Sequence, residues 1–145
     1  MTIYTRTRRQ QIGDIGEEVA AEYVLDVLQM RLLARRARVP HGEIDIIARQ
    51  GNAYVFIEVR TRSSSFGIYP YNVVGGHKRM VLVRSARLWQ AQRQLANAAT
   101  RYDLITIRRL PKDQYDIRHW PAFIDPTENL PQNQNCELLP TQQPI

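Results

Sequence analysis

The sequence predicts an α/β fold in which helices cover a mixed β-sheet. Two segments, residues 12–30 and 77–99, repeat their apolar positions every three or four residues, which is typical of helices. Five short runs, most of them rich in β-branched and aromatic residues, are typical of strands: 32–39, 43–49, 54–62, 102–109 and 115–119. The resulting order of helix, three strands, helix and two strands predicts a sandwich with helices on the sheet.

The first predicted helix has one acid in an unexpected place. Its polar residues recur at helical spacing and form one solvent-facing stripe: Asp14, Glu18, Glu22, Asp26 and Gln29. Glu17 lies outside this stripe, on the side of Ala20 and Ala21. An acid near a helix N-terminus can interact favourably with the helix dipole, and a functional role is the alternative.

The second and third predicted strands bring two further acids together. Gly51-Asn52 between these strands is typical of a hairpin turn. Asp45 and Glu58 are equally far from this turn, so they should be neighbours on one face of the hairpin. Two opposed carboxylates repel each other unless a cation lies between them. A divalent metal such as Mg²⁺ would resolve the repulsion, and ion pairs with Arg60 or Arg62 would do so equally well.

The distribution of charge predicts a polyanionic partner. All 20 Lys and Arg residues lie at or before Arg118, whereas only 11 of the 14 acids precede Trp120, so this part carries a net charge of +9. Eighteen of the 20 are arginines, which bind phosphates with two parallel hydrogen bonds. We therefore expect nucleic acid rather than a membrane as the partner, although the arginines could also serve solubility alone.

The chain is expected to form one domain over residues 1–126 and to end in a disordered tail over residues 127–145. The tail is rich in Pro, Asn and Gln and contains too few apolar side chains to offset the entropy lost on folding. A single cysteine excludes an internal disulfide, and no apolar run is long enough for a membrane span or a secretory signal. These features fit a cytoplasmic protein.

In several short motifs the chain resembles the YraN family of small bacterial proteins, within the restriction-endonuclease-like superfamily of the PD-(D/E)xK type. The motifs are GDIGEEVAAEYVL in the first helix, GEIDII and VFIEVRTRSSSFG in the central strands, Lys78, RYD at residues 101–103 and Ala122-Phe123. Their order and spacing resemble the family over residues 13–123. The resemblance implies a three-layer α/β sandwich with a mixed central sheet in the order αβββαβ.

The resemblance also implies a magnesium-dependent nuclease site. By position, Asp45 and Glu58 would bind Mg²⁺ or Mn²⁺, and Glu17 would be a third ligand or would position a water molecule. Arg60, Arg62, Lys78 and Arg79 are expected to contact phosphates, of DNA rather than RNA, and branched or damaged DNA is the expected substrate. A homodimer would suit such a substrate.

One position departs from the superfamily motif, which ends in lysine two residues after the glutamate. This chain has Arg60 there. Lysine can lose its proton when desolvated, whereas arginine stays charged and can only orient or stabilise other groups. The alternative prediction is therefore a nucleic-acid-binding module without catalytic activity.

Overall fold

A computed structural model describes residues 2–5, 15–62 and 74–127 of the 145-residue chain. It contains two helices, α1 (Ile15–Asp26) and α2 (Gly76–Gln92). The strands are β1 (Ile3–Thr5), β2 (Arg31–Val39), β3 (Gly42–Gln50), β4 (Ala53–Arg62), β5 (Thr100–Leu110) and β6 (Gln114–Trp120). The predicted α/β class is confirmed, whereas the restriction-endonuclease-like arrangement stays a prediction.

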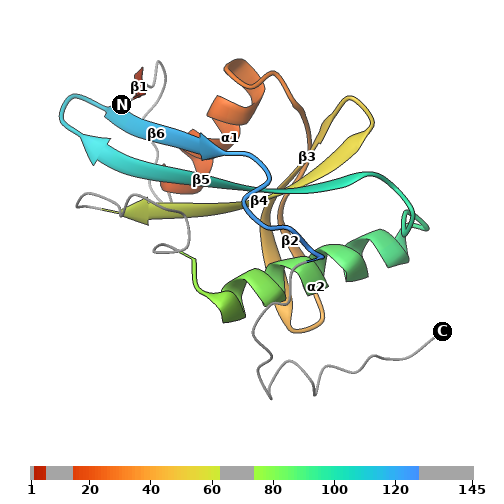
Figure 1. The fold of residues 1–145 in the computed structure, drawn as a ribbon. Coiled ribbons are helices and arrows are strands. Elements are labelled where there is room, and N and C mark those ends of the chain that lie inside the picture. Colours follow the sequence, from red (N-terminus) through yellow and green to blue (C-terminus); the bar gives the residue numbers. More distant parts are fainter. Residues whose placement is uncertain (1, 6–14, 63–73, 128–145) are drawn as a thin grey trace.

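The six strands form one open mixed sheet in the order β1-β6-β5-β4-β3-β2 (Figure 1). Neighbouring strands are antiparallel except β4 and β5, which are parallel and are connected through α2. A parallel pair needs such a crossover because the chain must return to the starting end of the sheet. None of the described helices is long and apolar enough to cross a membrane.

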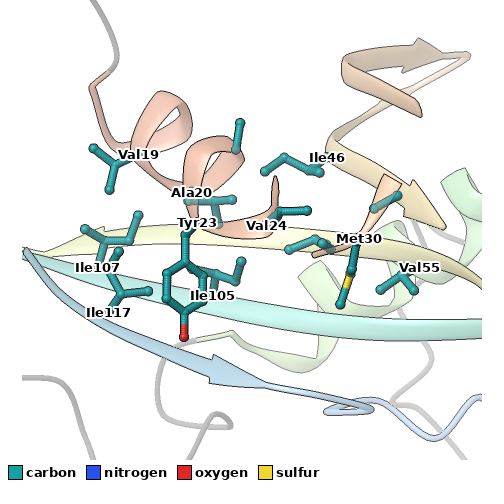
Figure 2. Close-up of a cluster of buried hydrophobic side chains, with 14 of the residues drawn as sticks. Val19, Ala20, Tyr23, Val24, Met30, Ile46, Val55, Ile105, Ile107 and Ile117 are labelled. Carbon is teal, nitrogen blue, oxygen red and sulfur yellow. The ribbon is translucent and has the colours of Figure 1, made fainter. Parts of the chain in front are cut away.

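The helices lie on opposite faces of the sheet, and each covers its own apolar cluster (Figure 1). Under α1, the buried side chains of the helix meet those of the strands, as Figure 2 shows for Val19, Ala20, Tyr23, Val24, Met30, Ile46, Val55, Ile105, Ile107 and Ile117. Under α2, the cluster is centred on Phe56, Leu104, Ala86 and Trp89. Alternate residues of β4 and β5 therefore point to different helices, as the period of two in a strand requires.

Both helices end earlier than the sequence predicts. The predicted ends are Met30 and Ala99, and the observed ends are Asp26 and Gln92. After α2, Gln94 adopts a left-handed backbone conformation, and the Leu95 amide donates to the Gln90 carbonyl at 2.8 Å. This geometry closes a helix and is normally signalled by glycine, which is absent here. The predicted start at residue 12 lies outside the described residues, as does the predicted tail after Thr127.

The prediction also missed a strand and placed one side chain on the wrong face. β1 pairs with β6, and its three residues are too few to show a periodicity. Strand alternation predicts Ile44 on the same face as Ile46, but Ile46 packs in the cluster under α1 and Ile44 in the cluster under α2. β3 stops pairing with β4 at Ile46, so the alternation imposed by that pairing does not extend to Ile44.

A close approach between α2 and the turn before β3 fixes that helix on the sheet. Arg84 donates to the backbone carbonyls of Pro40 and His41 at 3.1 and 2.6 Å. Next to them Gly42 faces Ser85, and a Cβ atom added at Gly42 would lie 2.2 Å from the Ser85 Oγ. Glycine is therefore required at position 42 by space.

We predict that Gly42→Ala lowers the free energy of unfolding by about 1–3 kcal/mol, because the methyl group overpacks this contact. Chemical denaturation of the variant measures the effect. Adding Ser85→Ala should restore most of the loss, since the next nearest atoms, Arg84 Nη2 and the Ser85 Cβ, both lie 3.4 Å from the new methyl group. The matched control is Gly75→Ala, where nothing lies within 4 Å. Additive effects of Gly42→Ala and Ser85→Ala would contradict this explanation.

Candidate active site

The site begins where β3 and β4 separate. The hairpin has the predicted register, with Gln50 opposite Ala53 and Gly51 in a left-handed conformation at the turn. Pairing ends at Ile46 and Ile57, one residue before Asp45 and Glu58. The Val59 amide then donates to the Asp45 carboxylate at 2.9 Å, so a side chain takes the place of a backbone partner. The two strands diverge around these acids.

Asp45, which is half-buried, and Glu58, which is buried, form a carboxyl pair, as the register predicts. The Glu58 side chain is 4% exposed, and the two carboxyl groups are within hydrogen-bonding reach. Burial, followed by the Asp45 charge, raises the pKa of Glu58 to about 7, although Lys78 and Arg60 act in the opposite direction. Burial also raises the pKa of Asp45, and the Val59 amide opposes that shift. Full ionisation of the pair is therefore disfavoured at neutral pH.

Two cations from different elements meet one oxygen of this pair. Arg60 Nη2 lies 3.3 Å and Lys78 Nζ lies 3.8 Å from Glu58 Oε1. Arg60 follows Glu58 by two residues in β4 and so shares its face. Lys78 projects from the first turn of α2. Arg60 Nε is buried and has no hydrogen-bond partner among the described residues, so this donor is left for a partner outside them, such as water or a ligand.

Glu17 approaches from α1 and is bound by Arg36 of β2. Arg36 Nε donates to Glu17 Oε2. The Glu17 charge contributes to the raised pKa of Asp45, after burial, so the α1 acid lies near the pair. Arg36 stands between the pairs Arg35–Ile46 and Ala37–Ile44, which places it opposite Asp45 in the register, and its backbone is left-handed.

The sequence analysis did not identify Arg36. Counting back from the Val39–Gly42 pair would have placed it opposite Asp45, because that part of the β2–β3 register is regular. The left-handed backbone at Arg36 could not be anticipated, since arginine seldom adopts it.

One of the predicted phosphate contacts, Arg79, does not join the site. Arg79 is buried and donates to the Val74 carbonyl at 3.3 Å, which makes it a support for the start of α2. Arg62 ends β4 beside Arg108, and its side chain lies outside the described residues. Arg60 and Lys78 are the predicted cations that the structure brings to the carboxyl pair.

A second buried acid, Asp103, has a structural environment. Its carboxylate accepts two hydrogen bonds from Arg101, one from the Ala122 amide and a contact from His119, all between 2.8 and 2.9 Å. Burial alone would raise the pKa of Asp103, but these donors, with His119 first among them, lower it overall. Asp103 is thus saturated with partners, whereas Glu58 is not. Arg101 and Asp103 therefore form a structural pair.

The donors around Glu58 suit a divalent metal of the Mg²⁺ type. Across the described residues, no group of three or more His, Cys, Asp or Glu side chains is arranged to hold a metal ion. Mg²⁺, however, is usually bound through one or two carboxylates and completes its shell with water and phosphate oxygens. Asp45 and Glu58 supply that minimum. The pKa of each is raised, and a bound ion would favour the deprotonated form of both carboxyl groups.

The raised pKa of Glu58 predicts a variant that is more stable than the parent chain. A folded pKa above the ordinary value of 4.5 contributes stability at pH 4.5 and below, and this contribution is lost as the pH rises through 7. Glu58→Gln should therefore unfold with a free energy similar to that of the parent at pH 5 and about 2–3 kcal/mol higher at pH 8. Urea denaturation at both pH values measures this, with Glu43→Gln at an exposed position of β3 as the control. An equal effect of Glu58→Gln on the free energy of unfolding at pH 5 and pH 8 would contradict a raised pKa of Glu58.

Comparison with known proteins identifies the family. The chain matches the model of the Uncharacterised protein family UPF0102 over residues 16–107. A UPF0102 protein of Moorella thermoacetica is 46% identical over 103 residues, covering 71% of this chain and 84% of the relative. Another from Syntrophotalea carbinolica is 36% identical over 118 residues, covering 81% and 94%. The YraN-like resemblance is thereby confirmed at the level of the family, and the wider superfamily stays a prediction. The chain belongs to the uncharacterised protein family UPF0102.

Proposed function

We propose that this protein is a metal-dependent phosphodiester hydrolase that acts on DNA. The observation that carries the proposal is the pair formed by the half-buried Asp45 and the buried Glu58 at the point where β3 and β4 diverge. Burying two neighbouring carboxyl groups costs stability, because each opposes ionisation of the other. Such an arrangement is expected where function requires it, and a bound cation would remove the repulsion.

In this proposal Asp45 and Glu58 would hold Mg²⁺ or Mn²⁺. The ion, when bound, would supply polarisation of the phosphodiester and activation of a water molecule. The Val59 amide fixes the Asp45 carboxylate through a backbone hydrogen bond. Glu17, held by Arg36, lies close enough to affect Asp45 and would orient water at the edge of the pair.

Arg60 and Lys78 divide the cationic role that one lysine has in the superfamily motif. Arg60 keeps its charge at all relevant pH values and would stabilise the negative charge that develops on the phosphate. Lys78 meets the same Glu58 oxygen and is 44% exposed, so it can reach a phosphate bound in front of the pair. A primary amine can also exchange a proton, which arginine cannot.

DNA is proposed as the substrate because the arginine excess provides phosphate contacts without an evident element for reading bases. Recognition would then depend on the backbone and on the shape of the DNA, as expected for branched or damaged substrates.

A second function is favoured by Arg60, which stands where the superfamily motif has lysine. Two permanently placed cations on Glu58 can neutralise this acid without a metal, and the domain would then bind DNA without cutting it. The two functions differ in whether cleavage accompanies binding.

We predict that the parent chain cleaves DNA in the presence of Mg²⁺ or Mn²⁺ and that Asp45→Asn reduces the rate at least 100-fold while binding is retained. The substitution keeps the shape of the side chain but removes the charge that would hold the ion. The measurement uses labelled single-stranded, nicked and four-way-junction DNA, with gel analysis of the products. Asp26→Asn, at the exposed end of α1, is the matched control and should cleave like the parent chain.

The outcomes separate the two functions. Salt-dependent binding of the same DNA without cleavage by the parent chain would favour the binding module. The absence of both binding and cleavage would contradict both functions.

A further inference from the structure

Beyond the carboxyl pair, the sheet face on the α2 side changes from apolar to polar. Along β4 the buried Phe56 is followed on this face by Glu58 and Arg60, and along β5 Leu104 is followed by Thr106 and Arg108. The opposite face of the same strands stays apolar under α1, where Val59, Ile105, Ile107 and Ile117 are packed (Figure 2). The polar face is therefore a distinct surface that continues from the candidate site.

The strand register places three arginines next to one another on this surface. Arg60 of β4 is paired with Thr106 of β5, and Thr106 is paired with Arg118 of β6. Arg108 stands two residues further along β5, opposite Asp116 of β6. Arg60, Arg108 and Arg118 form what we call the arginine row, which crosses β4, β5 and β6; these strands lie side by side in Figure 1.

Buried groups beneath the row hold it in position. Asp116 is 4% exposed, and its oxygens lie 3.3 Å from Arg108 Nη2 and 3.9 Å from Arg118 Nε. Thr106 is also buried and accepts a hydrogen bond from the Trp120 indole at 3.2 Å. The ion pair with Asp116 thus orients the Arg108 guanidinium before any ligand arrives, which reduces the entropy lost on binding.

The row retains exposed positive charge despite its acids. The side chains of Arg60, Arg108 and Arg118 are 32%, 30% and 46% exposed. Asp116 is shared by two arginines, so that group keeps a net charge of one. Among the described residues, Arg118 has only the long contact to Asp116, and its five N–H donors suit the oxygens of a phosphate.

The dimensions of the row fit a polynucleotide strand. Two strand spacings separate Arg60 from Arg118, a distance of about 10 Å, and Arg118 lies roughly 12 Å from Glu58 when the two-residue offset is included. This span exceeds the axial rise of about 3.4 Å per nucleotide, so Arg118 would meet a different phosphate from the one at the carboxyl pair.

We propose that the arginine row binds the DNA backbone a few nucleotides from the phosphate that a metal ion would bring to Asp45 and Glu58. The inference rests on the proposed function and extends it by defining the path of the substrate strand across β4, β5 and β6. Charge complementarity identifies the occupant as a phosphodiester backbone, since the row offers guanidinium donors that suit phosphate oxygens.

The test measures DNA affinity as a function of salt. Fluorescence anisotropy of labelled DNA is recorded with the full chain in metal-free buffer containing EDTA, so that no cleavage occurs. Arg118→Gln should weaken binding about tenfold at low salt. It should also reduce the slope of log K against log salt by about one, because one phosphate contact is lost. Arg118→Lys should keep the slope of the parent chain.

Arg109→Gln is the matched control. Arg109 is exposed on β5, next to Arg108 of the arginine row, but faces the α1 side, so its removal should leave the slope within experimental error. Unchanged thermal melting of Arg118→Gln will show that the substitution acts on binding rather than on folding.

The outcomes distinguish this inference from the proposed function. Equal effects of Arg118→Gln and Arg109→Gln, or none from Arg118→Gln while the parent chain binds DNA, would overturn the arginine row alone. The absence of salt-dependent binding by the parent chain would overturn the row and the proposed function together. Tighter binding of RNA than of DNA of the same sequence would overturn the assignment of DNA as the occupant.

Discussion

The hydrogen bond from the Val59 amide to the Asp45 carboxylate determines how the rest of the site is arranged. It replaces a backbone contact at the position where β3 leaves β4, and so it both ends the hairpin ladder and fixes the acid. Glu58 is then the neighbour of Asp45, with Arg60 on the same strand face and Lys78 arriving from α2. From the other face of the sheet, Glu17 approaches through α1 and is held by Arg36. A continuous ladder would leave no opening in which groups from both layers could meet.

Two buried acids, Asp103 and Glu58, differ in how strongly the fold favours their ionised forms. This difference distinguishes a structural residue from a candidate site residue. Asp103 is fully buried and has four polar contacts, so the fold favours its ionised form. Glu58 is almost as buried, but burial and Asp45 outweigh the help from two cations, and its pKa is raised to about 7. Stability alone would not select such a group, because an apolar residue of similar size would cost less. The strain at Glu58 is therefore consistent with a group that is kept for binding or chemistry.

The parts of the site that lie near the hairpin turn were predictable from the sequence. Symmetry about Gly51-Asn52 was enough to pair Asp45 with Glu58, since register in a two-residue hairpin follows from the turn. The strand period also placed Arg60 on the same face as Glu58. Features that depend on tertiary packing were not predictable in this way. Ile44 changes cluster because β3 leaves the sheet plane defined by β4, and α2 is closed by Gln94, which carries no glycine signal.

The positions of the individual arginines in the fold also could not be predicted from the sequence. Charge counts predicted a basic surface, but they could not distinguish Arg79, which is buried under the start of α2, from Arg118, which is exposed in the arginine row. That distinction needed the register of β4, β5 and β6, which are brought together by a crossover of nearly 40 residues. Local sequence patterns hold little information about such distant pairings.

The central claim is that Asp45 and Glu58 together bind a divalent metal ion, and direct titration of the DNA-free protein with Mn²⁺ tests it most directly. Electron paramagnetic resonance of free Mn²⁺ at pH 8, where Glu58 is mostly ionised, reports the bound fraction without requiring catalysis. The account predicts at least one bound ion per chain in the parent protein, a loss of that binding in Asp45→Asn, and unchanged binding in Asp26→Asn. Equal Mn²⁺ binding by all three proteins, or none by the parent chain, would contradict it.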